Sequence, residues 1–222
     1  MSDSRTWLVL PITLVALTAN AAAQTVRVEG LRTENMVNPI GIDVPAPRLS
    51  WMLAADRRGT MQSAYEIRIT GDRGVAVWNT GKVASEESVN RVYGGPALAP
   101  GKRYTWQVRV WDDRRRASEW SAPAYWETGL MGAANWKAKW IEPDLPEDTT
   151  RSNPSPLLRT AFTLNGSVAS ARAYVTAHGL YELQINGRRV GDQVLAPGWT
   201  SYDARLQYQT YDVTALLRRG AV

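Results

Sequence analysis

The chain of 222 residues contains no cysteine and a single histidine, His178. A disulfide is therefore excluded, and the fold must rely on buried side chains alone. With one histidine and no thiol, a zinc site is not expected. A Ser-His-Asp arrangement would have to use His178, yet the sequence has no Gly-x-Ser-x-Gly elbow. His178 precedes Gly179 at the end of an expected strand, so we predict a turn or surface role for it.

The sequence also lacks heptads and amphipathic helical stripes, and short segments alternate with period two instead. Residues 63–70 and 103–111 are the clearest examples, and glycine-rich turns separate such segments. The side chains expected on the inner faces are Tyr65, Ile67, Ile69, Tyr104, Trp106, Val108 and Val110. Short strands without long helices predict an all-β, antiparallel sandwich fold.

Phenylalanine occurs once, whereas there are ten tryptophans. Exposed tryptophans stack on sugars and buried ones fill sandwich cores, so the number alone does not decide between the two. Alternation places Trp106 inward, and Trp51 is expected in the core of an early strand. Trp120 leads into the last strand, and a sugar platform from these three is the less favoured interpretation.

The spacing in "LAPGKRY" is typical of the tyrosine corner of fibronectin type III-like sandwiches. There the Tyr104 hydroxyl would hydrogen-bond to the turn backbone and fix the crossover between sheets. We therefore expect a complete fibronectin type III-like (immunoglobulin-like) domain over residues 25–131.

A second domain is expected over residues 132–222, and it contains a long proline-rich loop at 142–156. Alternation resumes at 157–164, with Leu158, Thr160, Phe162 and Leu164 facing one way. Asn186-Gly187 predicts a type I′ hairpin turn. Asp212 is expected to cap a single helical turn that stops near Gly220. The segment has room for roughly four or five strands, whereas a jelly roll has about eight. We therefore expect an incomplete, jelly-roll-like β-sandwich that is truncated within the domain.

The net charge of +5 comes from arginines scattered along the chain. They form no stripe with interleaved aromatics, which disfavours a nucleic-acid partner. The run Arg114 to Arg116 is expected in a solvated turn. Adjacent strand residues face opposite ways, so neither Glu86-Glu87 nor Asp112-Asp113 can flank one bond, and we expect both pairs to be solvated.

Residues 1–23 have the organisation of a secretory signal peptide. Arg5 precedes an apolar run from Trp7 to Ala19, and small residues follow at Ala21 and Ala23. A membrane anchor is the alternative, but Pro11 interrupts the run, which is shorter than a spanning helix requires. We expect a periplasmic or secreted protein with no membrane attachment after cleavage.

The run "LYELQINGRRVGDQVLAPGWTSYDARLQYQTYDVTALLRRG" resembles the amino-terminal β-sandwich of bacterial α-L-rhamnosidases, glycoside hydrolase family 78. The segments "PIGIDVPAPRLSWML", "YTWQVRVWD" and "WSAPAYWETGL" resemble the fibronectin-like domain that precedes it, and "NWKAKWI" resembles the junction. The resemblance runs from about Val28 to the end. It departs at "DDRRRAS", where the family usually has a glycine turn.

The resemblance implies a parent enzyme that hydrolyses terminal α-L-rhamnose from glycosides or polysaccharides. In that family a downstream (α/α)6 barrel supplies two acidic residues for inverting hydrolysis. Nothing in this chain resembles the barrel, so no catalytic residue can be assigned and the chain alone is predicted to be inactive. Its implied partner is the missing carboxy-terminal catalytic domain. The alternative hypothesis is a free-standing carbohydrate-binding or adhesion module.

Trp199, with Tyr202, is the predicted substrate-binding pair, because loop aromatics at the mouth of a sandwich can stack on a pyranose. The alternative is that Trp199 packs against the barrel or its own sheet. No cofactor or metal is assigned. Some family members bind rhamnose through calcium in an accessory sandwich, and Asp192, Asp203 and Asp212 lie on expected loops or strand ends. Those ligands do not map onto this chain, so solvated carboxylates are preferred.

Overall fold

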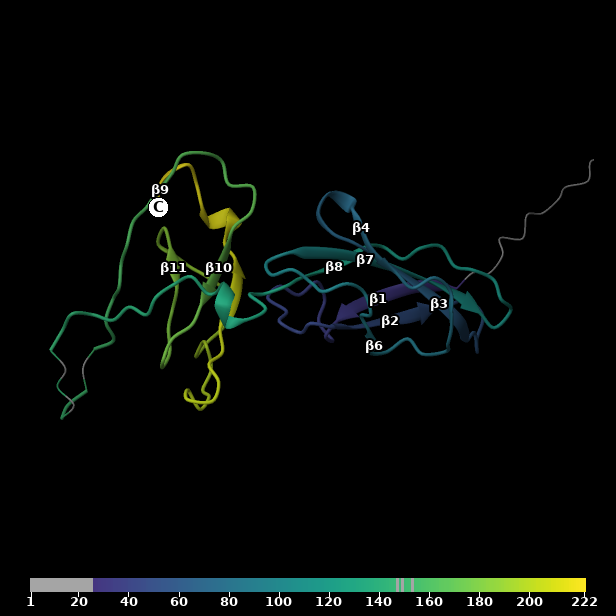
Figure 1. Ribbon diagram of the computed structural model, residues 1–222, viewed down its shortest axis with the longest axis horizontal. Helices are drawn as coiled ribbons and strands as arrows, with labels where there is room; N and C mark the ends of the chain where they lie inside the picture. Colours follow the sequence, from purple (N-terminus) through teal and green to yellow (C-terminus); the bar gives the residue numbers. More distant parts are fainter. Residues whose placement is uncertain (1–25, 147, 149, 153) are drawn as a thin grey trace, which may run out of the picture.

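The computed structural model describes residues 26–222 apart from residues 147, 149 and 153. The expected signal peptide lies outside the described residues. Figure 1 shows two β-rich bodies placed end to end, the first formed by β1–β8 and the second by β9–β14. Throughout the part of the chain that the structure describes, the helices are three short 3-10 turns, and none is long and apolar enough to cross a membrane. The expected all-β fold class is confirmed.

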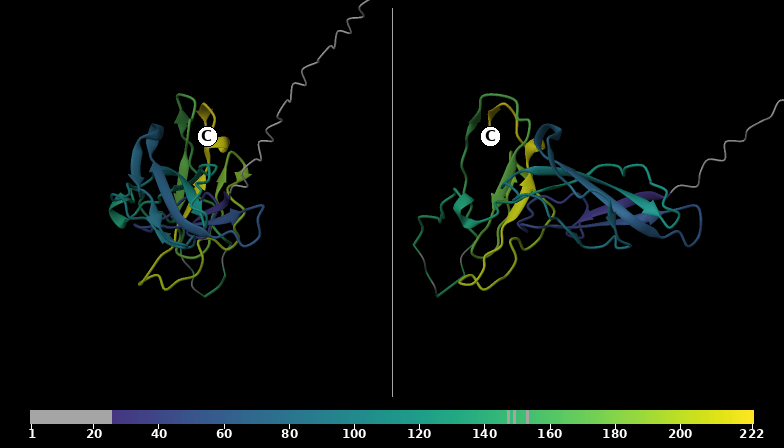
Figure 2. Two further views of the ribbon diagram at one scale, coloured as in Figure 1. Left: turned by 90° about the vertical axis from the view of Figure 1, so that its right-hand side faces the viewer. Right: turned by 45° about the vertical axis from the view of Figure 1, so that its right-hand side comes forward.

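Two antiparallel sheets build the first body, and Figure 2 shows it from two further sides. One sheet has the strand order β1 (Arg27–Thr33), β2 (Arg48–Ala54) and β6 (Arg91–Val92). The other has the order β4 (Ala76–Asn79), β3 (Gln62–Thr70), β7 (Arg103–Asp112) and β8 (Ala124–Glu127), and β5 (Val83–Ala84) also pairs with β3. The 3-10 turn η1 (Asp72–Gly74) joins β3 to β4.

The core of the first body lies between these sheets and is built around Trp51, Trp106 and Trp126, each at most 2% exposed. All side chains expected to face inward from β3 and β7 are buried. The sugar-platform interpretation is wrong for Trp51 and Trp106. Trp120 is half-buried, and the guanidinium of Arg68 lies 4.1 Å from its ring centroid.

The tyrosine corner is also confirmed. The backbone N–H of Ala99 donates a hydrogen bond of 2.8 Å to the Tyr104 hydroxyl. The Tyr104 ring stacks on Trp126 with centroids 5.4 Å apart. One residue thereby ties the turn before β7 to the centre of the core.

The expectation that both acidic pairs are solvated is correct for Glu86-Glu87 and wrong for Asp112, which is 1% exposed. Asp112 accepts hydrogen bonds from the backbone N–H groups of Arg114 and Arg116 and from the Arg116 guanidinium, at 2.8–2.9 Å. Burial alone would raise the pKa of Asp112, but these donors lower it below its usual value. Arg115 adopts φ 61°, a left-handed conformation that glycine takes more easily.

The second body consists of three two-stranded antiparallel sheets. They are β10 (Arg172–Val175) with β13 (Gln209–Asp212), β11 (Gln184–Ile185) with β12 (Arg188–Arg189), and β9 (Thr163–Leu164) with β14 (Gly220–Ala221). The 3-10 turns are η2 (Ala133–Asn135) and η3 (Thr214–Leu216). Val190, Tyr211 and Val213 form its buried hydrophobic cluster. Asn186 and Gly187 have φ of 52° and 72°, which confirms the type I′ turn.

Two expectations for this body need correction. The strand predicted at 157–164 is confined to β9, and Leu158 and Phe162 are 53% and 49% exposed. Alternation identifies two faces, but no described strand pairs with residues 157–161. The predicted helical turn is a 3-10 turn in which Val213 occupies the cap position. The Asp212 carboxylate nevertheless accepts the Thr214 N–H at 3.0 Å.

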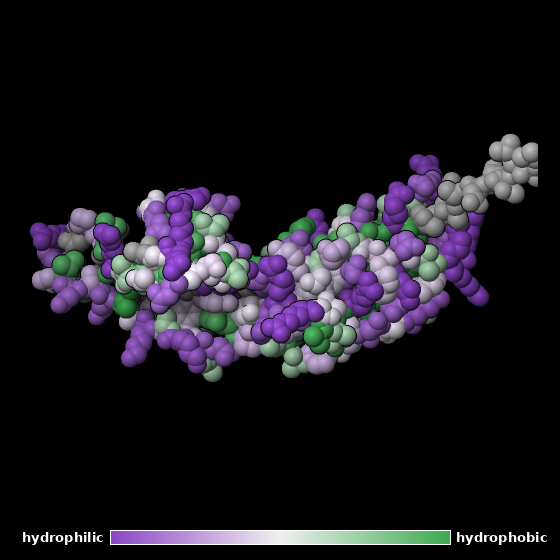
Figure 3. Space-filling model, turned by 90° about the horizontal axis from the view of Figure 1, so that it is seen from above, coloured by the Kyte–Doolittle hydropathy of each residue, from purple (hydrophilic) through white to green (hydrophobic). Residues whose placement is uncertain are grey.

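Figure 3 shows hydrophilic residues spread over both bodies, with hydrophobic residues in separate small spots on that side. No continuous apolar face is visible in this view. The surface is consistent with the scattered arginines of the sequence.

Candidate functional site

The connection between β12 and β13 carries the two predicted substrate-binding residues. Its base is fixed because the side-chain amide of Gln209 donates to the Pro197 carbonyl oxygen at 3.0 Å, and Pro197 is buried. A turn follows in which the Gly198 N–H donates to the Leu195 carbonyl oxygen at 3.0 Å. The next residue, Trp199, stands outward and is 82% exposed. This loop lies at the lower end of the second body in Figure 1.

Tyr202 is half-buried behind Trp199, with the ring centroids 6.0 Å apart. Its hydroxyl accepts the Gly179 N–H at 2.8 Å, and its ring stacks on His178 with centroids 4.9 Å apart and planes at 4°. The other neighbour of His178 is Trp140, at 4.5 Å. We call Trp140, His178, Trp199 and Tyr202 the aromatic cluster.

The structure thus brings together the predicted pair and adds two rings to it. His178 is exposed at the end of β10, as predicted for a surface residue, but it also joins two segments of the cluster. Trp140 was missed because it lies just before the proline-rich loop, in a segment with no periodic pattern. Its only sequence signal was its place in "NWKAKWI", which resembles the family's domain junction.

Trp140 also lines a cavity of about 360 Å³ between the two bodies. Residues from both bodies form its wall, namely Asp43, Leu130, Gly132, Ala133, Trp136, Trp140, Thr176, Leu206 and Tyr208. Trp136 packs edge-on against Tyr208 with centroids 5.8 Å apart. Aromatic surface therefore continues from the exposed Trp199 loop to the junction of the two bodies.

Polar contacts fix this junction. The Tyr208 hydroxyl donates to the Asp43 carboxylate at 2.6 Å and accepts the Leu130 N–H at 2.8 Å. Burial, followed by the hydrogen bond to Asp43, raises the pKa of Tyr208 above its usual range. Asp43 also accepts the Met131 N–H at 2.8 Å, so its carboxylate is engaged twice.

Glu127, at the end of β8, forms a second link between the bodies. It is 8% exposed and receives a two-pronged contact from Arg172 of β10, with both distances 2.7 Å. Arg103 of β7 donates to the same carboxylate at 2.5–2.8 Å. Burial alone would raise the pKa of Glu127, but the hydrogen bonds and charges of Arg172 and Arg103 lower it below its ordinary value.

The acidic residues considered for calcium do not converge. Asp192 and Asp203 are exposed, and Asp212 lies 3.0 Å from the Arg172 guanidinium. Among the residues that the structure describes, no group of three or more His, Cys, Asp or Glu side chains could hold a metal ion. The chemistry that this region offers is flat aromatic surface, with hydroxyl and carboxylate groups at its inner end. Such a surface stacks against the C–H faces of sugar rings.

The described residues thus form an immunoglobulin-like β-sandwich joined to a second β domain that carries the exposed Trp199 ring. Residues 28–132 match the Rha78A-like, N-terminal immunoglobulin domain, and residues 166–221 match the alpha-L-rhamnosidase N-terminal domain. The chain belongs to the α-L-rhamnosidase family and carries its amino-terminal domains.

Individual relatives agree with this assignment. An alpha-L-rhamnosidase from Formosa agariphila is 35% identical, over 82% of this chain and 22% of the relative. One from Streptomyces avermitilis is 30% identical, over 88% of this chain and 35% of the relative. The solved structure of alpha-L-rhamnosidase from Dictyoglumus thermophilum superimposes with a TM-score of 0.78 at 36% identity, covering 88% of this chain and 24% of that one. The chain therefore spans between about a fifth and a third of the length of these relatives.

Proposed function

We propose that this chain is the amino-terminal accessory region of an exported α-L-rhamnosidase that removes terminal α-L-rhamnose from glycosides. In this proposal hydrolysis takes place in a carboxy-terminal helical barrel, and the present domains position that barrel and contact the glycoside. The observation that carries the proposal is that both domains, in order, match amino-terminal rhamnosidase domains over 88% of this chain but only 24% of the solved relative.

The junction between the bodies suits a positioning role. The Glu127–Arg172 contact and the Tyr208–Asp43 hydrogen bond join them at two separate points. A charged pair with two parallel hydrogen bonds restricts orientation as well as separation. The first body therefore acts as a stiff base for the second rather than as a domain on a free linker.

The aromatic cluster supports the second part of the proposal, a contact with the glycoside. Trp199 leaves one large ring in solvent without a covering group among the described residues. A pyranose ring stacked on it would bury apolar C–H surface on both partners. Tyr202 and His178 support the loop from behind.

Comparing two proteins tests the assignment. The purified chain is expected to release no p-nitrophenol from p-nitrophenyl α-L-rhamnopyranoside. The same chain extended by the sequence encoded beyond codon 222 is expected to release it. Hydrolysis by the short chain would place the chemistry in these domains, and a stop codon directly after codon 222 would leave the free-standing binding module as the better explanation.

Calorimetric titration with L-rhamnose, with and without calcium, tests the carbohydrate contact. Saturable heat that disappears in Trp199→Ala supports contact through the loop. The absence of any saturable signal would remove both the contact and the module alternative, while leaving the positioning role intact.

Export is the remaining part of the proposal. Expression of the full chain in a bacterial host, followed by fractionation, is expected to place it outside the cytoplasm with an amino terminus beginning after Ala23. Retention of residues 1–23 on the mature protein would contradict it.

A further inference from the structure

A second cavity of about 320 Å³ lies between the β11–β12 turn and the segment that runs from η3 into β14. Its wall is formed by Asn186, Arg188, Ala215, Leu216, Arg218 and Arg219. In Figure 1 the η3 segment lies at the upper end of the second body, opposite the Trp199 loop. The cavity is therefore separate from the aromatic cluster and from the junction of the two bodies.

The chemistry of this cavity is cationic. Half of its lining residues are arginines, and none is acidic. Several arginines elsewhere in the described residues are paired with carboxylates, as in Arg48–Glu34, Arg109–Glu66 and Arg172–Glu127. Within the described ranges, no carboxylate lies within 4.0 Å of Arg188, Arg218 or Arg219.

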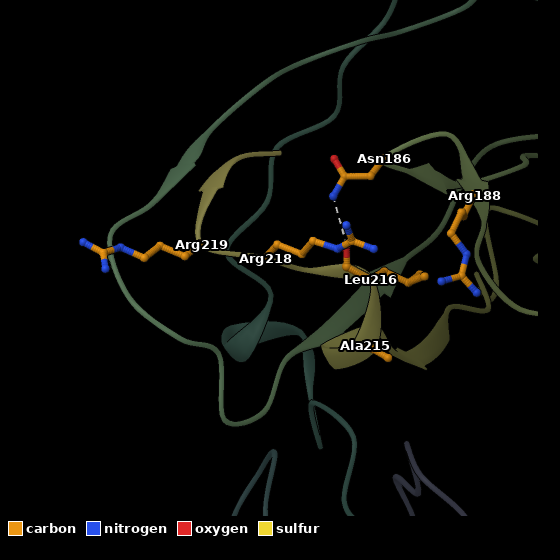
Figure 4. A pocket seen from close by; sticks show the side chains of 6 residues that line it. All are labelled: Asn186, Arg188, Ala215, Leu216, Arg218 and Arg219. Carbon is orange, nitrogen blue, oxygen red and sulfur yellow. Dashed lines mark hydrogen bonds between the residues drawn. The ribbon is translucent and has the colours of Figure 1, made fainter.

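Figure 4 shows Arg188 and Arg218 turned towards the space between the hairpin and the last segment, whereas Arg219 extends away from them. The two walls are tied together because the Asn186 side-chain amide donates to the Leu216 carbonyl oxygen at 3.0 Å. The type I′ turn fixes the wall that carries Arg188, and η3 precedes Arg218 on the other. Two guanidinium groups from different elements are thus held beside one opening.

Guanidinium groups stay charged at every physiological pH, so neighbouring ones repel unless an anion lies between them. Their planar forks match the oxygen geometry of carboxylate and sulfate groups. Leu216 and Ala215 add apolar surface, which suits the C–H face of a sugar better than a bare inorganic ion. The compact cavity also differs from the long basic stripe with stacking aromatics that nucleic acids require.

We infer that this cavity binds an anionic group of a saccharide, a uronic acid carboxylate or a sulfate ester, through Arg188 and Arg218. The inference rests on the proposed function, since it specifies acidic glycans as a class of ligand for this accessory region. A glycan that reaches from this cavity to the aromatic cluster would contact both ends of the second body.

Titration of the full chain with three oligosaccharides of equal length tests the inference. The probes are an oligogalacturonate, a sulfated dextran oligomer and unmodified dextran. We expect one or both charged probes to bind and the neutral one not to bind, with affinity falling as sodium chloride rises from about 50 mM to about 300 mM. A preference between carboxylate and sulfate identifies the anionic group, and no saturable binding of either charged probe overturns the inference.

The variant Arg188→Ala/Arg218→Ala is expected to weaken binding of the charged probe by about tenfold or more, because each lost arginine removes charge-assisted hydrogen bonds. The matched control is Arg58→Ala/Arg114→Ala, which removes the same two charges from exposed positions in the first body and should change affinity less than about twofold. Both side-chain pairs are exposed, so unchanged thermal melting is expected for both variants.

If the control variant lost as much affinity for the charged probe, general charge attraction would explain the binding, and the inference would be overturned. Tighter binding of a DNA duplex with the same dependence on Arg188 and Arg218 would assign the cavity to nucleic acid instead. Rhamnoside hydrolysis by the extended chain is measured separately, so failure here leaves the proposed function standing.

Discussion

Trp199 combines high exposure with a fixed backbone, because the loop beneath it is held by Gln209 and the turn at Leu195–Gly198. Such a side chain can be removed with little effect on the fold, since it buries little surface. The effect of Trp199 on ligand affinity can therefore be measured separately from its effect on the stability of the fold.

We predict that Trp199→Ala abolishes saturable rhamnose binding while its melting temperature stays within about 2 °C of the parent chain, because exposed positions rarely change stability by more than about 0.5 kcal/mol. Titration calorimetry and thermal melting followed by circular dichroism measure the two effects. Leu157→Ala is the control, because Leu157 is 97% exposed on another segment. Unaltered binding in Trp199→Ala would assign the contact to other residues.

Gly129 is a residue whose small size the junction requires. A β-carbon at this position would lie 2.2 Å from the Tyr208 hydroxyl and 2.5 Å from an Asp43 carboxylate oxygen. Both groups are engaged in the hydrogen bonds that join the bodies. Neither the Tyr208 side chain nor the Asp43 side chain can move away from the added β-carbon without breaking these hydrogen bonds.

We therefore predict that Gly129→Ala lowers the free energy of unfolding by on the order of 2 kcal/mol, as expected for an overpacked contact. Urea unfolding followed by tryptophan fluorescence measures it. Gly166→Ala serves as the control, because a β-carbon there meets nothing within 4 Å. Equal stability of the two variants would show that the junction relaxes around the added methyl group.

At the scale of single elements, the β11–β12 hairpin isolates the effect of backbone conformation. A β-carbon at Gly187 meets nothing within 4 Å, yet its φ is 72°. Replacement by alanine therefore adds backbone strain without a steric clash. We predict that Gly187→Ala lowers the free energy of unfolding by about 1 kcal/mol. Urea unfolding of Gly187→Ala and of the control Gly166→Ala measures this difference. If the two variants had the same free energy of unfolding within experimental error, the turn would have adopted another type at no energetic cost.

The elements also show what sequence patterns can and cannot predict. Alternation located β3 and β7 and their inner faces, because in a two-sheet domain one periodic face must be buried. The same pattern failed at 157–161, since it says nothing about whether a neighbouring strand exists. Asp112 was misplaced for a related reason, because its burial depends on donors supplied by the following turn.

At the scale of the whole molecule, the candidate site depends on contacts that no local pattern reveals. Trp199 and Tyr202 were predictable because they lie close together on one loop. Trp140 and His178 join them only through folding, and the Tyr208–Asp43 bond links residues far apart in the sequence. Only the family resemblance pointed to the junction, through the segment "NWKAKWI".

The stability of the junction should depend on pH through the ionisation of Glu127. Its pKa in the folded protein lies below its ordinary value of 4.5, because the arginine contacts outweigh burial. Its contribution is therefore fully present above the unfolded pKa and is lost as the pH falls through the lower, folded value. We predict that the two bodies unfold together at neutral pH and separate into two transitions as the pH falls through the lowered pKa of Glu127.

Differential scanning calorimetry between about pH 3 and pH 7 measures this change. Glu127→Gln should lower the free energy of unfolding by about 3 kcal/mol at neutral pH, since it leaves the largely buried Arg172 guanidinium with only the more exposed Asp212 carboxylate as a charged partner. It should also show the two transitions at every pH. Glu34→Gln is the matched control, because the Glu34–Arg48 pair lies within the first body and its loss should leave the pH at which the bodies separate unchanged. If Glu127→Gln kept a single transition at pH 7, the Tyr208–Asp43 contact and the packing around Gly129 would be sufficient to couple the bodies.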